Sequence, residues 1–486
     1  MPTCAPSLSP ARARAACSPR EPERCGGRHY PDDVADDDAD DLRETPLTGS
    51  ALRRGARLAS LPAGFAARTT WGIGRRLVGA PAAAVMNDVQ RRTADQVFSV
   101  LGQLKGGAMK FGQALSIFEA ALPEELVAPY RETLTKLQDA APPMGAATVR
   151  RVMEREFGPD WADRFPDFEI TPAAAASIGQ VHHTWFVPEP GAEPVEVAVK
   201  LQYPGAGDAL RSDLRQIGRL ARLFGTLMPN LDVKALVAEL QERVAEELDY
   251  SLEADAQARF AEAFADDPEI VVPRPLAHTE RALVTTWLPG DRSLADVITT
   301  GTQQERDHLG EAYVRFLFAG PVRAGLLHAD PHPGNFRVLP DGRLGVVDYG
   351  AVARVPDGLP APIGPLLRAA ADGDYATVAE GLRTEGFLKP GTRIDAEVLE
   401  RYLSPLVTPI VDDTFSFDRE WLRRQSQRLA TPGPDGMSTA LKLNVPPEYL
   451  LIHRVWAGGI GVLCQLGATA RFRAIVSDSL PGFATA

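Results

Sequence analysis

The sequence contains little cysteine, has no long apolar run and carries no excess of basic residues. Four of its 486 residues are cysteine and none form a C-x-x-C pair, so we expect no structural zinc and a reducing compartment. No segment reaches about 18 uninterrupted apolar residues, so the sequence predicts no membrane span. The formal net charge of −12 argues against a nucleic-acid-binding protein, which would carry a basic stripe.

Signals for export or membrane insertion are also missing near the two ends of the sequence. The Arg-rich start superficially resembles a targeting segment, but it has no apolar core of the signal-peptide kind. The apolar stretch 455–470 is rich in glycine and flanked by basic residues, which favours a buried helix. We therefore expect a cytoplasmic protein whose membrane contact would be peripheral, on the inner face of the cell membrane.

The chain has enough apolar residues, 44% beside 24% charged, for two or three globular domains. Residues 1–48 are rich in Pro, Arg and then Asp, and we expect a disordered, acidic and Pro-rich tail. Residues 49–145 show a helical pattern, and residues 146–290 mix helices with strands. Residues 291–486 are predicted to be mostly helical.

A basic amphipathic pattern covers residues 52–77, where apolar residues at helical spacing lie beside several arginines. A helix of this kind can bind an anionic membrane surface. Packing of the same helix against its own domain explains the pattern equally well.

The most informative stretch is His328-Ala-Asp330-Pro-His-Pro-Gly-Asn335, followed by Asp348-Tyr-Gly. Phosphoryl transfer of the kinase type needs a carboxylate near the nucleophile and, five residues later, an Asn that reaches a metal. A second carboxylate holds Mg²⁺ on the phosphates. Asp330, Asn335 and Asp348 have this order and spacing, so the sequence predicts a site for a nucleotide and Mg²⁺.

The simpler alternative is a surface turn in which Asp and Asn side chains bond to the local backbone. Two neighbouring segments argue against it. Residues 343–347 form a short apolar run that can be the strand delivering Asp348, and residues 313–327 predict an apolar helix beneath the loop.

A second part of the site is predicted upstream, where Lys200 ends a Val-Ala-Val-Lys strand as the phosphate-binding Lys of kinases does. Such a Lys needs an acidic partner, and residues 231–264, which read as one long helix, offer several. The alternative is an edge-strand Lys that blunts a sheet. The candidate partners on the helix are Glu246, Glu247, Asp249 and Glu253.

Two further segments carry unusual small residues. Where ordinary kinases have a Gly-rich loop, this chain has an Ala-rich one, which should be stiffer because Ala avoids positive φ; an Ala-rich helix start is the alternative. Upstream, Lys110 and Gln113 lie three residues apart on one face of a predicted helix that contains glycines, and they could be structural rather than functional. The loop residues are Ala173, Ala174, Ala175, Ala176 and Ser177.

Together these motifs resemble the UbiB/AarF atypical protein-kinase-like family, which includes the coenzyme Q biosynthesis kinases of mitochondria. The K-x-G-Q motif, the Ala-rich loop, the E-x-D motif at 247–249 and HADPHPGN with its later D-[FY]-G stand in the family's order over residues 50–470. The resemblance implies an α+β, two-lobed protein-kinase-like fold with an N-terminal helical extension that carries the K-x-G-Q motif. It places the small lobe at 146–290 and the large lobe at 291–486.

The resemblance also implies the roles of the site residues. Lys110 would pair with Glu247 to close the pocket, and Lys200 would pair with Glu253. Asp330 would be the catalytic acid of the loop. The nucleotide would be ATP, contacted by Lys200, Gln113 and the Ala-rich loop from Ala173 to Ser177. The Mg²⁺ ligands would be Asn335 and Asp348.

The resemblance implies an ATPase or small-molecule kinase activity that is associated with isoprenoid lipids and quinones. The expected partners are therefore a nucleotide, an isoprenoid lipid or quinone precursor, and an anionic membrane surface, with a homodimer as a further candidate. This chain departs from the commoner family pattern in having Asp348-Tyr-Gly rather than D-F-G, and in lacking an acidic residue near Thr286, where the family often has one.

Two other functions stay open. Aminoglycoside and choline kinases share the H-x-D-x-x-x-x-N loop, although the K-x-G-Q helix and the Ala-rich loop favour the UbiB-like reading. A non-catalytic scaffold that binds a nucleotide is the other alternative, because retained residues do not prove turnover.

Overall fold

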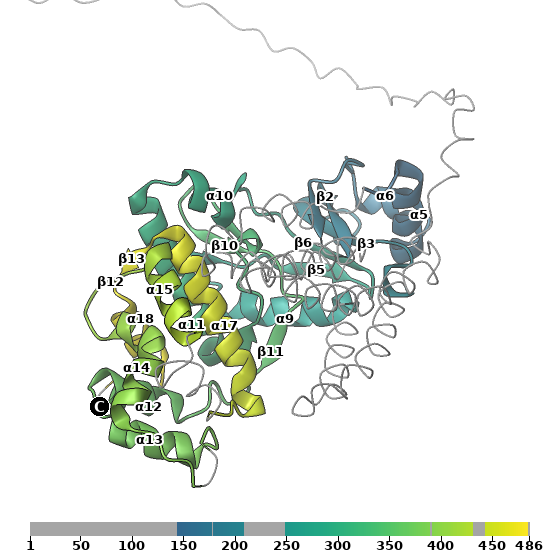
Figure 1. Cartoon of the computed structure of the whole chain (residues 1–486). Helices are drawn as coiled ribbons and strands as arrows, with labels where there is room; N and C mark the ends of the chain where they lie inside the picture. Colours follow the sequence, from purple (N-terminus) through teal and green to yellow (C-terminus); the bar gives the residue numbers. More distant parts are fainter. Residues whose placement is uncertain (1–142, 177, 209–247, 389–390, 431–442, 485–486) are drawn as a thin grey trace, which may run out of the picture. The chain divides into compact units, whose positions relative to one another are not determined.

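The computed structural model describes residues 143–176, 178–208, 248–388, 391–430 and 443–484 (Figure 1). The expected tail and most of the expected helical extension lie outside the described residues. The described part begins with α5 (Ala146–Phe157) and the short α6 (Trp161–Arg164), which precede the first strand.

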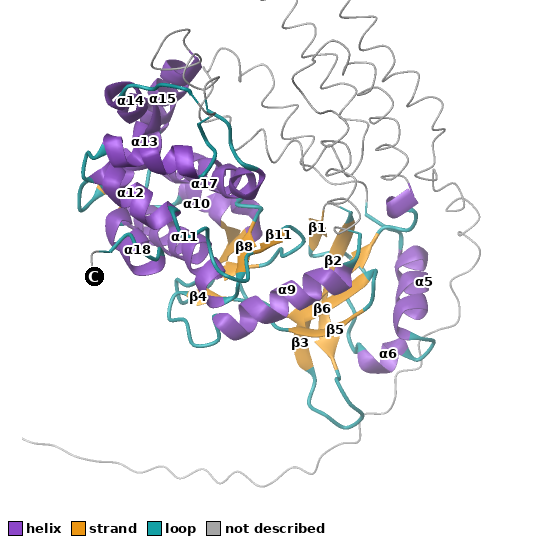
Figure 2. Ribbon diagram, turned by 90° about the horizontal axis from the view of Figure 1, so that it is seen from below, coloured by secondary structure: helices purple, strands orange, loops and turns teal. Residues whose placement is uncertain are grey.

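An antiparallel five-stranded sheet follows, in the order β1-β2-β3-β6-β5 (Figure 2). Period-two alternation in β3 gives this sheet two different faces. Val197, Val199 and Leu201 are fully buried against α5, whereas Ala198 and Lys200 point to the opposite side. The strands are β1 (Ala174–Ala176), β2 (Gly179–Phe186), β3 (Val195–Gln202), β5 (Pro275–His278) and β6 (Ala282–Thr286).

Helix α9 (Tyr250–Ala263) packs on that opposite face, through Tyr250 and Ala254 against Leu283 of β6. The prediction of one long helix over 231–264 is wrong at residues 248–249, where the chain is not helical, and residues 231–247 lie outside the described ones. Leu248 is in a turn, and Asp249 caps α9 by accepting a hydrogen bond from the Ser251 backbone N–H at 3.0 Å. A side chain that caps a helix marks its beginning.

The rest of the described chain is mostly helical, as predicted, and shares a large apolar core. The predicted helix over 313–327 is α11 (Gln303–Arg323), which begins earlier and ends sooner. Gly325 follows at φ +62°, and Leu326–His328 then form β8. The other helices are α10 (Leu294–Thr300), α12 (Ile363–Ala371), α13 (Tyr375–Thr384), α14 (Ala396–Val407), α15 (Arg419–Ala430), α17 (Pro447–Leu466) and α18 (Phe472–Ser479).

Short strands frame the loop that carries the HADPHPGN motif. One sheet has the order β4-β10-β9-β7, and β11 pairs with β8. The strand predicted at 343–347 is β10 (Leu344–Val346), which leads directly to Asp348. The remaining strands are β4 (Ile270–Val271), β7 (Arg292–Ser293), β9 (Phe336–Val338), β11 (Val352–Arg354), β12 (Phe415–Ser416) and β13 (Thr469–Ala470).

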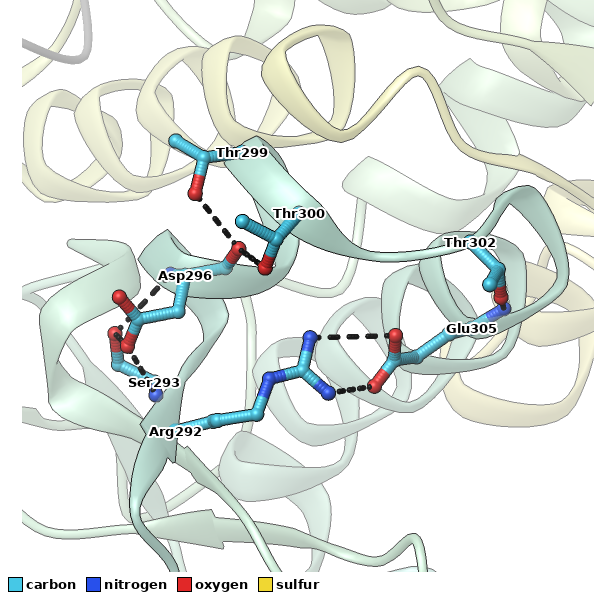
Figure 3. Close-up of polar contacts among 7 residues, drawn as sticks. All are labelled: Arg292, Ser293, Asp296, Thr299, Thr300, Thr302 and Glu305. Atoms are coloured by element: carbon cyan, nitrogen blue, oxygen red, sulfur yellow. Dashed lines mark hydrogen bonds and ion pairs between the residues drawn. The ribbon is translucent and has the colours of Figure 1, made fainter.

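A polar cluster anchors the chain where it enters the helical region (Figure 3). Ser293 and Asp296 form a capping box at the start of α10, and Thr302 caps α11. The guanidinium of Arg292 contacts the carboxylate of Glu305 at 2.6 Å. The hydrogen bonds from Ser293 lower the pKa of Asp296, which favours the charged form that receives them. The segment just before Arg292 is thereby fixed at one end.

Helix α17 is the one described helix with the length and composition to cross a membrane, over Glu448–Leu466. Its window has a mean hydropathy of 1.2 and is 56% buried inside the protein. Burial to this extent is also typical of a core helix, in agreement with the buried helix predicted for this stretch.

A buried hydrogen-bond relay joins the segment just before α5 to the sheet through two side chains of β2. The Met144 backbone N–H donates to Oε1 of Gln180 at 2.8 Å, which orients the Gln180 amide so that its NH₂ faces Nε2 of His182 at 2.8 Å. Nδ1 of His182 lies 2.8 Å from the carbonyl oxygen of Glu169, which can only accept. His182 is therefore held neutral, with its proton on Nδ1.

We predict that this relay makes the protein less stable in acid. Burial lowers the pKa of His182 below its ordinary 6.5, so the unfolded chain binds a proton there before the folded chain does. The free energy of unfolding should then fall as the pH drops below about 6.5, by up to about 1.4 kcal/mol per pH unit. Urea unfolding between pH 5 and 8 measures this slope.

The variant His182→Gln should lose that part of the slope, while the matched variant His278→Gln, at an exposed position on β5, should retain it. Parallel slopes in His182→Gln and the unmodified protein would contradict the assignment.

Candidate functional site

A buried ion pair joins the sheet to α9. Nζ of Lys200 on β3 lies 2.8 Å from both carboxylate oxygens of Glu253, in the first turn of α9. The two side chains are 14% and 4% exposed. The ammonium also lies 4.9 Å from the centre of the Tyr250 ring, a cation–π contact. The pairing predicted between Lys200 and Glu253 is therefore present, and the edge-strand alternative is wrong because β3 is central in its sheet.

The charge state of this pair follows from its neighbours. Burial alone would lower the pKa of Lys200, but the carboxylates of Asp348 and Glu253 outweigh it and hold the pKa above its ordinary value. Burial raises the pKa of Glu253, and the nearby ammonium opposes this rise. Because the ammonium contacts both oxygens, we take the pair as ionised.

A cavity of about 460 Å³ lies beside the ion pair. Its size falls within the range of small-molecule and cofactor sites. One wall comes from the Ala-rich strand and β3, and another from the loop that carries Asn335 and the turn at Asp348. Lys200, Glu253 and Asp348 contribute charged groups to the lining, and Ala198, Leu283 and Leu288 contribute apolar side chains.

The structure brings Asn335 and Asp348 together at this cavity. The Val347 backbone N–H donates to the carbonyl oxygen of Asn335 at 3.0 Å, so the two segments lie side by side. Asp330 is not among the described residues that line the cavity, but Nδ2 of Asn335 donates to its carbonyl oxygen at 3.3 Å. The predicted acid is thus next to the candidate metal ligands.

Local contacts give the loop its shape. The Tyr313 hydroxyl of α11 donates to the carbonyl oxygen of Pro331 at 2.8 Å, and Nδ1 of His332 accepts from the Gly334 N–H at 3.1 Å. Nε2 of His328 lies 2.6 Å from the carbonyl oxygen of Asp348, which ties β8 to the turn after β10. The contacts of Tyr313 and His328 reach across these segments and hold them more rigidly than a surface Asx turn would be held, so the turn alternative is disfavoured.

The donor set suits Mg²⁺ better than a metal held wholly by protein. In the described part of the chain, no group of three or more His, Cys, Asp or Glu side chains is placed to hold a metal ion. Mg²⁺ takes one or two protein ligands and completes its octahedron with water and substrate phosphates. Asn335 and Asp348, both lining the cavity, fit such a partial set.

The Ala-rich segment forms the strand β1, so the alternative of a helix start is wrong. Its register with β2 pairs Ala174 with Val181 and Ala176 with Gly179. At Gly179 a Cβ atom would come within 2.1 Å of the Leu201 carbonyl oxygen, so only glycine fits at this end of the pairing between β2 and β3. All four alanines line the cavity: Ala173, Ala174, Ala175 and Ala176.

Four predicted site residues lie outside the described ones: Lys110, Gln113, Ser177 and Glu247. The proposed pairing of Lys110 with Glu247 therefore stays a prediction.

The structure also shows cavity residues that the sequence reasoning missed. Gln257 lies one helical turn after Glu253, and an i, i+4 search from that acid would have found it. Arg337 follows the buried Phe336 on β9, and strand alternation would have placed it on the cavity side. Asp291, just before β7, is the third such residue.

Comparisons with known proteins identify the family to which the chain is similar. The family model described as the ABC1 atypical kinase-like domain matches residues 136–382. A solved structure, the complex of Rv3197 with erythromycin from Mycobacterium tuberculosis, is 39% identical with a TM-score of 0.65, covering 84% of this chain and 100% of that one.

Curated relatives point the same way. The mitochondrial atypical kinase coq-8 of Caenorhabditis elegans is 29% identical over 416 residues, covering 83% of this chain and 52% of the relative. The mitochondrial atypical kinase COQ8 of Saccharomyces cerevisiae is 30% identical over 263 residues, covering 53% and 50%. The chain spans about half the length of these curated relatives. Because the family model matches just over half of the chain, the protein belongs to the ABC1 atypical kinase-like family.

Proposed function

We propose that the protein is a Mg-dependent ATPase or small-molecule kinase of the UbiB type. The observation that carries this proposal is the meeting of Lys200, Glu253, Asn335 and Asp348 at one cavity of about 460 Å³. A fixed ammonium, an amide and a carboxylate beside a cavity of this size suit the phosphates of a nucleotide better than they suit an uncharged ligand.

The chemistry divides among the residues as follows. Lys200, oriented by Glu253, neutralises negative charge on the nucleotide phosphates. Asn335 and Asp348 would hold Mg²⁺, which when bound spreads the charge that develops on the phosphates. Asp330 orients water or an acceptor hydroxyl and accepts its proton. Positioning and electrostatics supply most of the acceleration in such sites.

We further propose a two-lobed, protein-kinase-like division near residue 290. Support comes from the apolar clusters: one is built by α5 and the sheet, and a separate, larger one is built mostly by the helices. The cavity lies where residues from both regions meet.

For the acceptor we propose an isoprenoid lipid or a quinone precursor. Support comes from relatives whose printed names include the COQ8 kinases, and from the basic amphipathic pattern of residues 52–77, which suits peripheral contact with an anionic membrane. A cytoplasmic location at the inner face of the membrane is the corresponding proposal.

The direct test is Mg-dependent ATP hydrolysis by the full chain, with and without anionic vesicles. We predict that Asp348→Asn lowers hydrolysis by about 10²–10³-fold and removes the Mg-dependence of nucleotide binding, because the site loses its one carboxylate ligand. Asp341→Asn, at an exposed Asp in the turn before β10, is the matched control and should behave like the unmodified protein. Unchanged Mg-dependent affinity in Asp348→Asn would overturn the metal assignment.

Variants of the ion pair should show separate effects on the free energy of unfolding and on turnover in a double-mutant cycle. Lys200→Met leaves Glu253 buried without its cation, so we predict a loss of about 3–5 kcal/mol in the free energy of unfolding together with loss of turnover. Lys200→Met combined with Glu253→Gln removes both charges and should recover most of the stability but no turnover.

Chemical denaturation and ATP hydrolysis of the single and double variants measure the two effects. Recovery of turnover in the double variant would mean that Lys200 only maintains the fold.

A further inference from the structure

We propose that His183 is a positioning residue of the nucleotide site, which in its protonated form holds Trp287 in the wall of the cavity, so that nucleotide binding weakens when the ring loses its proton. This inference rests on the proposed function, because it concerns the shape of the same cavity. It adds a residue outside the cavity lining on which binding depends.

His183 lies on the face of the five-stranded sheet that contributes to the cavity. Strand alternation places it on the same side of β2 as Val181, and the register of β2 with β3 sets it opposite Ala198. Val181 and Ala198 both line the cavity, whereas His183 is not among the described residues that do. The imidazole ring therefore lies behind the cavity wall rather than in it.

The ring is held between two carboxylates. Nδ1 of His183 lies 3.1 Å from Oε1 of Glu169, and Nε2 lies 2.8 Å from Oε1 of Glu196 on β3. An ionised carboxylate only accepts hydrogen bonds, and a neutral imidazole has one donor nitrogen and one acceptor nitrogen. Both contacts can be hydrogen bonds only when the ring carries two N–H groups, so this is the geometry of an imidazolium.

The surroundings of the ring favour that charge. Burial alone would lower the pKa of His183, but the hydrogen bonds and charges of Glu169 and Glu196 outweigh it and raise the pKa above its ordinary 6.5. In the described part of the chain these two carboxylates are the charged groups that face the ring, and Trp287 adds an aromatic ring. The proton is lost only as the pH rises through this raised pKa.

Trp287, the first residue after β6, is held by the same residues. Its backbone N–H donates to the carbonyl oxygen of Glu196 at 2.9 Å, and the centre of its ring lies 4.6 Å from that of His183. An imidazolium this close to an indole gains a cation–π attraction that a neutral imidazole lacks. Trp287 is half-buried and lines the cavity, so its backbone and its ring tie this group of contacts to the cavity wall.

Deprotonation of His183 breaks this arrangement. One ring nitrogen becomes an acceptor that faces a carboxylate oxygen, and the cation that separated Glu169 from Glu196 is gone. One of the two carboxylates must then turn away, and the attraction between the His183 ring and the indole weakens. The wall at Trp287 is held less firmly as a result, and a nucleotide bound against it should bind more weakly.

The expected effect is modest because the two carboxylates are partly exposed. The side chains of Glu169 and Glu196 are 59% and 44% exposed, and ion pairs exposed to this extent are weak. We expect the dissociation constant of Mg-ATP to increase about threefold as the pH rises through the pKa of His183.

The test measures the dissociation constant of Mg-ATP for the full chain between about pH 6 and 9 by titration calorimetry, with Mg²⁺ in excess. The unmodified protein should show the increase with a midpoint above pH 6.5. His183→Gln, whose side chain takes up no proton, should lack the increase. His278→Gln, at an exposed position on β5 outside the cavity lining, is the matched control and should retain it.

A second variant distinguishes the charge of His183 from a contribution to the fold. Glu169→Gln keeps the shape of its side chain but removes one of the two charges that raise the pKa of His183. The increase should therefore move to lower pH, and it should become smaller because a Gln amide can also donate to the neutral ring. Should His183→Gln fail to fold, an unchanged pH profile in Glu169→Gln overturns the assignment.

The outcomes separate the two proposals. Affinity for Mg-ATP that is independent of pH in the unmodified protein, or an equal increase in His183→Gln, overturns the role of His183 and leaves the nucleotide site standing. Absence of Mg-ATP binding by the unmodified protein throughout this pH range overturns the proposed function, and this inference with it.

Discussion

The ion pair between Lys200 and Glu253 is the interaction on which the site depends, because it is the direct charged link between the central strand β3 and α9. The Tyr349 backbone N–H also donates to Oε1 of Glu253, at 3.4 Å, so the same carboxylate reaches the turn that carries Asp348. Strand, helix and turn therefore share one anchor. A small displacement of α9 would move Glu253 away from both Lys200 and the Asp348 turn. The contacts that hold α9 in place therefore also hold the charged part of the cavity in place.

Much of the site could be predicted from sequence because its chemistry is local. The spacing of Asp330, Asn335 and Asp348, and the alternation that brings Lys200 out of β3 opposite the buried Val199 and Leu201, can be read without knowing how the chain folds. The partner of Lys200 was harder to predict from the sequence, since several acids in one apparent helix were candidates. Choosing Glu253 required the family resemblance, and the structure agrees with that choice at 2.8 Å.

What could not be predicted depends on contacts between distant segments. Gln257 reads as an ordinary polar residue of a surface helix until the Pro273 carbonyl is placed beside it. The helix boundary at Asp249 was missed because residues on both sides have high helix propensity, and only the capping hydrogen bond shows where α9 begins. The His182 relay was likewise invisible, since its hydrogen bonds reach Met144 and Glu169, far along the chain.

The backbone conformation of the Ala-rich strand affects how the cavity could contact the phosphates of a nucleotide. A Gly-rich loop can adopt positive φ and bring its N–H groups close to phosphates. Here Ala174–Ala176 pair in regular register with β2, and Asp167 is the one non-glycine residue of the described chain at positive φ. A wall made of a regular strand and methyl groups is pre-formed rather than adaptable. It can exclude water on one side of the nucleotide, but it offers fewer N–H groups to the transferring phosphate. In the proposed mechanism, catalysis at this cavity would rely more heavily on Lys200 and on a metal held by Asn335 and Asp348 than in a kinase whose glycine loop closes over its substrate.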